Sequence, residues 1–165
     1  YCYILYLRHS DNILTNQHFL TKKGFYIIFL LLIIQICMGA FVAGLKAGYA
    51  YNTFPLMNSN ILPLEFFSMP GFFNNIINEP YTIQFFHRLG GSILLFLSIY
   101  ILIGNIKSGS KLNSFENQFC YVLMFQFILG VLTLILQIPI ILAVSHQIVA
   151  CILLLSVVRI LYTYQ

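Results

Sequence analysis

Four long apolar stretches, separated by polar segments, dominate the pattern of this chain. They cover about residues 25–45, 83–104, 119–138 and 140–161. Each is long enough to cross a hydrocarbon core of roughly 30 Å, which takes about 20 apolar residues in a helix. Stretches that alternate in direction can pack together as one compact unit. The pattern therefore predicts an all-α membrane protein, an antiparallel four-helix transmembrane bundle formed by residues 25–165.

Two polar segments complete the predicted organisation. Residues 1–24 are a polar connector that begins with the tail of a preceding apolar segment. Residues 46–82 form a long loop in which proline and glycine interrupt runs of Phe, Tyr, Leu and Met. This aromatic and aliphatic content favours a loop that lies along the bilayer surface over a free linker.

The composition supports the membrane prediction and limits the function classes. Of 165 residues, 60% are hydrophobic and 7% are charged, and the mean hydropathy is +0.90; a soluble domain has about one-quarter charged residues. The net charge is +4, but the Lys and Arg residues are scattered, so no nucleic-acid partner is expected. Five of them flank the apolar stretches on one side: Lys22, Lys23, Lys107, Lys111 and Arg159. The positive-inside bias predicts that this side faces the cytoplasm or the mitochondrial matrix.

Cysteine chemistry is not indicated by the sequence. The chain has four cysteines, and three of them (Cys37, Cys120 and Cys151) fall within apolar stretches. None forms a CxxC or a zinc-like spacing. We interpret them as buried thiols that pack as small hydrophobic side chains.

The candidate chemistry lies in two histidines at matching depth. An ionisable side chain within a membrane is costly, so by default it marks a site. His87 lies about four residues into the second stretch and His146 about six into the fourth, which at ~1.5 Å per residue puts both roughly 6–9 Å below the same boundary. Small neighbours, Gly91 beside His87 and Ala143 and Ala150 beside His146, leave room for a flat, bulky group.

The third stretch adds a polar and small stripe that is expected to face the bundle interior. Its members are Gln126, Gly130, Thr133 and Gln137. Two neutral imidazoles on facing helices are the usual means by which a membrane bundle holds the iron of a b-type haem. The sequence therefore predicts a haem b cofactor with His87 and His146 as its metal ligands, and it offers no catalytic residue in this chain.

Arg88 is the third candidate site residue. It follows His87 near the boundary, where a guanidinium could bind a haem propionate in two places. The alternative for Arg88 is an interfacial anchor that extends to the headgroups. For each histidine taken alone, the alternative is a hydrogen bond between helices.

Several segments resemble the haem A synthase family, specifically the C-terminal four-span half of its mitochondrial and proteobacterial type. They are Gly39–Gly48, Tyr51–Met57, Gln84–Arg88 and Leu142–Gln147. The resemblance covers the chain from about Lys22 onward. It implies an eight-span inner-membrane protein of two four-helix halves that oxidises a methyl group of haem O to the formyl group of haem A, for cytochrome c oxidase assembly.

In that family the C-terminal half holds haem b, and the N-terminal half binds haem O and has a glutamate three residues before its first histidine. Here the equivalent position is Gln84, and an amide cannot act as a general base. The resemblance thus implies a cofactor half whose substrate, haem O, is reached through an N-terminal half outside this chain. Besides membrane lipid, a second copy of the chain or the enzyme that makes haem O are candidate partners.

Two other functions remain open from the sequence. A four-span b-type cytochrome with two histidine ligands would only transfer electrons. A structural or transport bundle would use the histidines as hydrogen-bonding groups between helices, and it would bind no haem.

Overall fold

The computed structural model describes residues 22–109 and 114–163. The chain runs through α2 (Lys22–Gly44), the 3-10 helix η1 (Ala47–Tyr49), α3 (Phe72–Asn78), α4 (Pro80–Lys107), α5 (Phe115–Ile135) and α6 (Ile140–Thr163). Within the described residues, α2, α4, α5 and α6 are long and apolar enough to cross a membrane. The predicted connector, residues 1–24, lies almost wholly outside the described residues, so its organisation stays a prediction.

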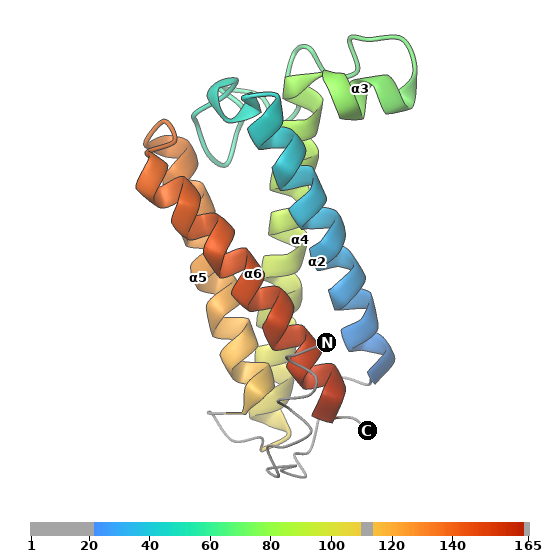
Figure 1. Ribbon diagram of the computed structural model, residues 1–165, viewed down its shortest axis with the longest axis vertical. Helices are drawn as coiled ribbons and strands as arrows, with labels where there is room; N and C mark the ends of the chain where they lie inside the picture. The colour runs from blue at the N-terminus through green and yellow to red at the C-terminus, as the bar shows by residue number, and fades with distance from the viewer. Residues whose placement is uncertain (1–21, 110–113, 164–165) are drawn as a thin grey trace.

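The four long helices form an antiparallel bundle, as predicted. α2 packs against α4 and α6, α4 packs against α5, and α5 packs against α6. Figure 1 shows α5 and α6 as one closely packed pair and α2 and α4 as another. Helices that follow one another in the chain therefore pack side by side, as in an up-and-down bundle.

Two helix starts are set by capping side chains. The Glu79 carboxylate accepts hydrogen bonds from the backbone N–H groups of Tyr81 (3.0 Å) and Thr82 (2.6 Å), and Pro80 occupies the first turn of α4. Both features favour helix initiation, so α4 begins three residues before the expected boundary at residue 83. Ser114 caps α5 in the same way, accepting from Asn117 N–H at 3.4 Å.

The connection between α5 and α6 differs from the expectation. α5 ends at Ile135 rather than at residue 138, because Gln137 (φ 59°) and Ile138 (φ 61°) adopt the left-handed conformation that breaks a helix. Gln137 is therefore exposed in the turn and is not part of the interior stripe predicted for it. Pro139 follows it, and α6 starts at Ile140.

Most of the buried apolar side chains gather in one cluster, in one half of the bundle. This cluster comprises Phe25, Ile28, Leu32, Leu94, Ile101, Phe119, Cys120, Leu123, Leu153, Val157 and Ile160. It lies toward the end of the bundle that contains Lys22, Lys23, Lys107 and Arg159, which we call the basic end. The opposite end, with residues 45–79 and the α5–α6 turn, is the loop end. The pair α5–α6 leans away from α2 toward the loop end (Figure 1).

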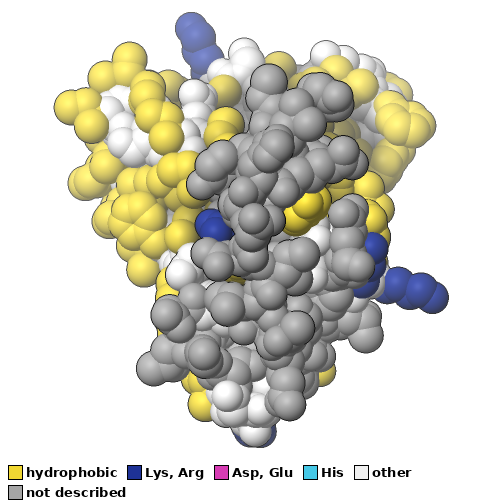
Figure 2. All heavy atoms as spheres, turned by 60° about the horizontal axis from the view of Figure 1, so that its bottom comes forward, with side chains coloured by type: hydrophobic (Ala, Val, Ile, Leu, Met, Phe, Trp, Pro, Cys, Tyr) yellow, Lys and Arg dark blue, Asp and Glu magenta, His cyan; other side chains and the backbone are white. Residues whose placement is uncertain are grey.

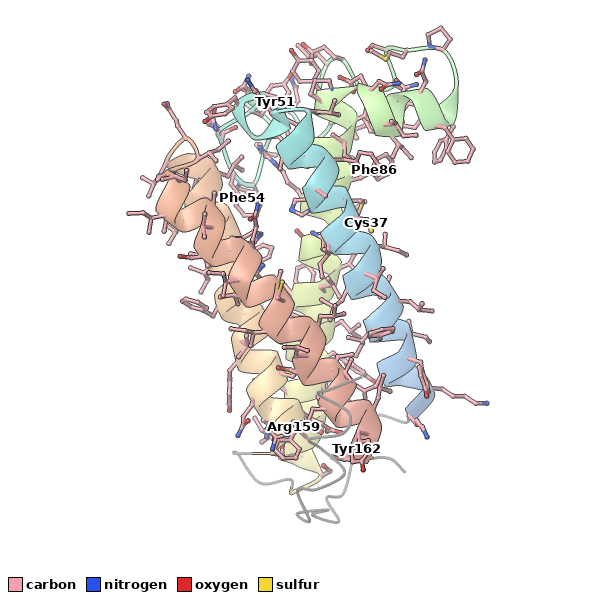
Figure 3. All side chains as sticks on the ribbon, viewed as in Figure 1. Cys37, Tyr51, Phe54, Phe86, Arg159 and Tyr162 are labelled. Atoms are coloured by element: carbon pink, nitrogen blue, oxygen red, sulfur yellow. The ribbon has the colours of Figure 1, made fainter. Side chains whose placement is uncertain are left out.

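Polar contacts also join the helices at the basic end. Asn105 on α4 donates to the Asn117 side chain on α5 across 2.8 Å, and both residues are buried. Arg159 on α6 stacks over the ring of Phe115 on α5, 3.8 Å from its centroid (Figure 3). These contacts and the apolar cluster make the basic end the closed end of the bundle.

The outside of the bundle is apolar, as expected for helices in lipid. Figure 2, which turns the basic end forward, shows hydrophobic side chains over the flanks, and the charged groups in view are Lys and Arg. Two cysteines contribute to this exterior: of the three cysteines in the described residues, Cys37 and Cys151 are exposed and Cys120 is buried. The expectation of buried thiols is therefore wrong for Cys37 and Cys151, because α2 and α6 turn those faces outward.

The segment between α2 and α4 is folded back on itself. An isolated bridge pairs Met57 with Asn60, and the side chain of Asn75 in α3 exchanges hydrogen bonds with the backbone of Met69. Large apolar side chains remain exposed on it, including Ile61 (77%) and Leu64 (81%). That this surface lies on the bilayer stays a prediction.

Candidate functional site

The two predicted ligands occupy equivalent places on α4 and α6. His87 precedes the buried core residue Leu94 by seven residues, and His146 precedes Leu153 by seven. Seven residues are about two helical turns, so both histidines lie the same distance from the closed core, toward the loop end.

The side chain of Gln35 on α2 reaches His87. Its amide nitrogen lies 3.1 Å from Nδ1 of the imidazole, and it donates to the backbone carbonyl of the same histidine across 2.9 Å. A backbone carbonyl only accepts, so the NH₂ group of the amide is the part that faces His87. One amide therefore contacts both the ring and the backbone of His87.

His146 has the same kind of partner on α5. The amide nitrogen of Gln126 donates to the His146 backbone carbonyl across 2.9 Å and lies 3.5 Å from Nε2 of its ring. The contact to the ring is longer than in the Gln35 pair and involves the other ring nitrogen, Nε2 in place of Nδ1. Each histidine is thus held from a neighbouring antiparallel helix by a glutamine.

Glycine makes room for each ring. A Cβ atom on Gly39 would lie 3.1 Å from Cε1 of His87, and one on Gly130 would lie 2.8 Å from Cε1 of His146. Each glycine comes four residues after the glutamine of its pair, and so on the same helix face. The imidazoles therefore lie directly against the backbones of α2 and α5.

The residues present fit a haem iron held between two imidazoles. A metal-bound histidine needs an acceptor for the N–H of its other ring nitrogen. Each histidine has a glutamine as neighbour, and the Oε1 atoms of Gln35 and Gln126 are buried without a hydrogen-bond partner. The Nδ1 atom of His146 is also buried without one. Unsatisfied buried polar atoms are costly, and these orphaned atoms are the ones that a ligated imidazole would use.

Residues 22–109 and 114–163 contain no group of three or more His, Cys, Asp or Glu side chains that could hold a metal ion. A bare ion such as zinc usually takes three or four protein ligands. Two histidines instead match an iron whose equatorial ligands come from a macrocycle.

Arg88 points to the loop end, where it binds backbone. Its guanidinium donates to the carbonyl oxygens of Tyr51 (2.6 Å) and Thr53 (2.8 Å), while its Nε atom is buried without a partner. Gln84, one turn earlier on α4, donates to the same Tyr51 carbonyl across 2.9 Å. Arg88 therefore fixes residues 51–53 over the site, and its predicted contact with a propionate stays a prediction.

Residues 51–54 enter the space between the helix pairs. Asn52 donates to the carbonyl of Leu134 at the end of α5 across 3.0 Å, and the ring of Phe54 packs against that of Phe127 on α5, with 5.8 Å between centroids. Figure 3 shows Phe54 between α5–α6 on one side and α2–α4 on the other. We call residues 47–54, which connect both pairs, the strap.

The strap is tied to the rest of the loop by Tyr51. Its hydroxyl donates to the Glu65 carboxylate across 2.7 Å, and this hydrogen bond is the main cause that raises the pKa of Tyr51 above its ordinary value. Tyr51 is only 7% exposed. The carbonyl and hydroxyl of one buried residue thus join the site to the outer loop.

Sequence reasoning found part of this site. Of the predicted stripe, Gln126 and Gly130 do face His146, whereas Thr133 bonds to the Leu129 carbonyl of its own helix. Gln35 and Gly39, which face His87, are not among the site residues that the sequence predicts. The missed signal is a repeat: Leu, Gln and Gly follow at steps of three and four in Leu32–Gly39 and again in Leu123–Gly130.

The chain is similar to known proteins along most of its length. Residues 4–158 match a family model described as "Cytochrome oxidase assembly protein". Proteins named haem A synthase are 42% identical over 131 residues in Wolbachia sp. subsp. Brugia malayi, 42% over 123 in Rickettsia felis, and 35% over 141 in Sinorhizobium fredii.

These alignments cover 77%, 73% and 84% of this chain but only 36%, 36% and 38% of the relatives. The chain therefore spans well under half the length of the curated proteins that it matches. No solved structure matches it. The family match over nearly the whole chain and the three relatives lead to one conclusion: this chain belongs to the haem A synthase family of cytochrome oxidase assembly proteins.

Proposed function

We propose that the chain is the C-terminal, haem-b-binding half of a haem A synthase. The complete enzyme would oxidise the methyl group of haem O to the formyl group of haem A, as an oxidoreductase of cytochrome c oxidase assembly. The observation that carries this proposal is the matched pair of histidine sites, each with a glutamine and a glycine on the neighbouring helix.

His87 and His146 would be the two axial ligands of the haem iron. When bound, haem b supplies one-electron transfer, and two histidine ligands leave no open position for oxygen. The protein's part is to hold both rings at one depth and to keep water away. The strap supports the second task, since Arg88 and Gln84 hold the Tyr51 carbonyl over the site.

The same geometry explains why the oxidation is assigned elsewhere. In the described residues, no carboxylate forms a hydrogen bond with either histidine. Glu79 caps α4, Glu65 accepts from the Tyr51 hydroxyl in the outer loop, and Glu116 lies in the first turn of α5 at the basic end. Among the described residues, each glutamate thus has a place away from the two rings, and we assign the substrate haem O to a separate N-terminal half.

The proposed location is the inner membrane of a bacterium or a mitochondrion, with the basic end on the cytoplasmic or matrix side. Besides lipid, the proposed partners are the N-terminal half, a second copy of the chain, or haem O synthase. The positive-inside bias supports the orientation, and the apolar flanks support the lipid contact.

The test is to produce the chain in membranes with haem b available and to record its absorbance. The expected spectrum is that of a low-spin haem with two nitrogen ligands, and it should be lost when His87 and His146 are both changed to Ala. Ser145→Ala, which alters the neighbour of His146 on α6, is the matched control and should keep the spectrum. A colourless wild-type chain, or a spectrum that survives the double change, contradicts the proposal.

A second candidate function, a b-type cytochrome that only transfers electrons, is favoured by one observation: Gln84 is an amide where catalysis would need a carboxylate. Supplying the N-terminal half of a relative together with this chain separates the two functions. Formation of haem A supports the synthase half. Full haem loading without haem A supports the cytochrome.

A further inference from the structure

Two glutamines within the membrane helices are not themselves proposed haem ligands, so their presence needs a separate explanation. Gln35 and Gln126 lie on different helices, in otherwise apolar sequence, and each is hydrogen-bonded to a different histidine. A polar side chain in a membrane helix is costly. Two of them at equivalent positions call for an explanation by function as well as by packing.

The orientation of each amide is set by its backbone partner. Because the His87 and His146 carbonyls can only accept, each glutamine presents its NH₂ group to its histidine. Each Oε1 atom is then buried and without a partner. This is half of the hydrogen-bonding capacity of the amide, and it lies beside a ring that would bind metal.

When an imidazole binds a metal, its second ring nitrogen needs a hydrogen-bond acceptor instead of a donor. An imidazole that binds iron through one nitrogen carries its proton on the other, and that N–H requires an acceptor. Among the described residues, Gln35 is the only side chain bonded to the His87 ring, and Gln126 the only one bonded to the His146 ring. A half-turn of the terminal amide would bring the unpaired Oε1 to face the ring, and the amide would then give up the hydrogen bond that it donates to the histidine carbonyl.

Glycines of α4 provide the space that the Gln35 amide occupies. A Cβ atom on Gly90 would collide with Oε1 of Gln35, and one on Gly91 would lie 3.4 Å from its Nε2. Two successive glycines on α4 thus clear the space around the amide, and Gly130 does so for the ring that Gln126 contacts. Any larger residue at Gly90 would fix or displace the amide.

The repeat argues against coincidence. Each glutamine comes three residues after a buried leucine of the core cluster and four before the glycine that faces the ring. The histidines match as well, with Leu94 and Ile101 following His87 at the same steps as Leu153 and Ile160 follow His146. The two sites therefore share one spacing of leucine, glutamine, glycine and histidine residues along their helices.

We propose that Gln35 and Gln126 are positioning residues for the two axial histidines, each accepting the ring N–H through its Oε1 atom when the histidine is a ligand. This inference rests on the proposed haem-binding function. An accepted hydrogen bond makes the imidazole a stronger donor to iron, which stabilises the oxidised state. The glutamines thus set both the affinity for haem and its reduction potential.

The experiment compares Gln35→Met and Gln126→Met with wild type in the full chain loaded with haem b. Methionine keeps the length of the side chain and removes its hydrogen bonds. Each variant should bind haem about 10–100-fold more weakly, and the potential of the bound haem should rise. A tenfold change in the reduced-to-oxidised ratio corresponds to about 59 mV for one electron.

Two further variants make the readout specific. Gln118→Met changes the same residue type at an exposed position about two turns before Gln126 on α5, and it should leave affinity and potential unchanged. Gln35→Glu restores an acceptor at the same length, so its potential should return to the wild-type value or fall below it. A merely structural glutamine would not move the potential in opposite directions with Met and Glu.

The outcomes separate this inference from the proposed function. If the wild-type chain binds no haem, the proposed function fails and this inference fails with it. If the wild-type chain binds haem and both Met variants keep its affinity and potential, only the positioning role is overturned. Helix content measured by circular dichroism shows whether a weakened variant is still folded.

Discussion

Glycine matters at this site because it has no side chain. Gly39 and Gly130 let an imidazole lie against a helix backbone, and this close approach fixes how far α4 and α6 stand from their partners. In an ordinary helix position, replacing Gly with Ala stabilises by about 1 kcal/mol. Here the added methyl group meets the ring, so the steric cost opposes the gain in propensity.

Gly130→Ala should therefore impair haem binding more than Gly39→Ala does. The new Cβ atom would be 2.8 Å from His146 in the first case and 3.1 Å from His87 in the second. Gly44→Ala is the control, since nothing lies within 4 Å of a Cβ atom there. Haem titration of the three purified variants measures the order, and equal affinities for Gly130→Ala and Gly44→Ala would contradict it.

Gln84 supplies a donor at a place where a carboxylate could not. Its amide binds the Tyr51 carbonyl, and the side chain is only 2% exposed. In Gln84→Glu, an ionised carboxylate would face that carbonyl oxygen, so we expect a loss of about 1–3 kcal/mol in unfolding free energy. A protonated carboxyl group can donate again, so stability should recover as the pH falls.

The measurement for Gln84→Glu is thermal unfolding in detergent across a pH series. Gln147→Glu, at an exposed position on α6, is the control and should differ little from wild type at any pH. A Gln84→Glu chain that is as stable as wild type at neutral pH would show that the Tyr51 contact contributes nothing.

At the scale of elements, the strap joins one helix pair to the other. η1 packs its Gly48 against Ile138 of the α5–α6 turn, so closely that a Cβ atom on Gly48 would collide with that side chain. Asn52 adds hydrogen bonds to the Gly48 carbonyl (2.9 Å) and to Leu134. At the loop end, the strap therefore links the two helix pairs.

Gly48→Ala should loosen this connection and lower the midpoint of thermal unfolding. Ile138→Ala alone removes the other partner and should also destabilise, but the double variant should recover much of the loss, because the methyl group added at Gly48 then fills space left by the shortened Ile138. A double-mutant cycle measures the coupling. Simple additivity of the two losses would mean that the contact does not matter.

The elements also show what the sequence could and could not predict. The four long helices follow from the length of the apolar stretches alone. A segment that crosses the lipid must be apolar over about 20 residues, and it must satisfy its backbone hydrogen bonds within a helix. The end of α5 could not be predicted in this way, because Leu136 and Ile138 are as apolar as the residues of the helix before them. Only the left-handed conformation of Gln137 and Ile138 ends the helix. Gln35 could not be predicted as a site residue either, because the sequence around it does not indicate that α2 packs beside His87 of α4.

At the scale of the whole molecule, the bundle is closed at the basic end, and its two helix pairs stand further apart toward the loop end. The buried cluster joins all four helices near the basic end. The histidines lie on the loop-end side of that cluster, and the helix pairs diverge in the same direction (Figure 1). The matching depth of His87 and His146 could be predicted from sequence, because it depends only on counting residues along helices of known direction.

Haem binding should therefore change the loop end and leave the basic end as it is. Spin labels on cysteines placed at Phe41 and Ile141, both exposed on α2 and α6 at the loop end, should give a shorter and narrower distance distribution when haem b is added. Labels at Tyr26 and Leu155, exposed further toward the basic end, should give the same distribution with and without haem. The native cysteines are first replaced by serine. A change at both pairs, or at neither, contradicts the prediction.

The buried cluster at the basic end also bears on the order of events during biogenesis. Its contacts involve only side chains of this chain, so the helices can insert and associate as soon as they have been synthesised. We therefore expect the basic end to be folded before any haem arrives. In a cell short of haem, such a protein would accumulate as a ready receptor in the membrane, and its supply would not need to be timed to that of the cofactor.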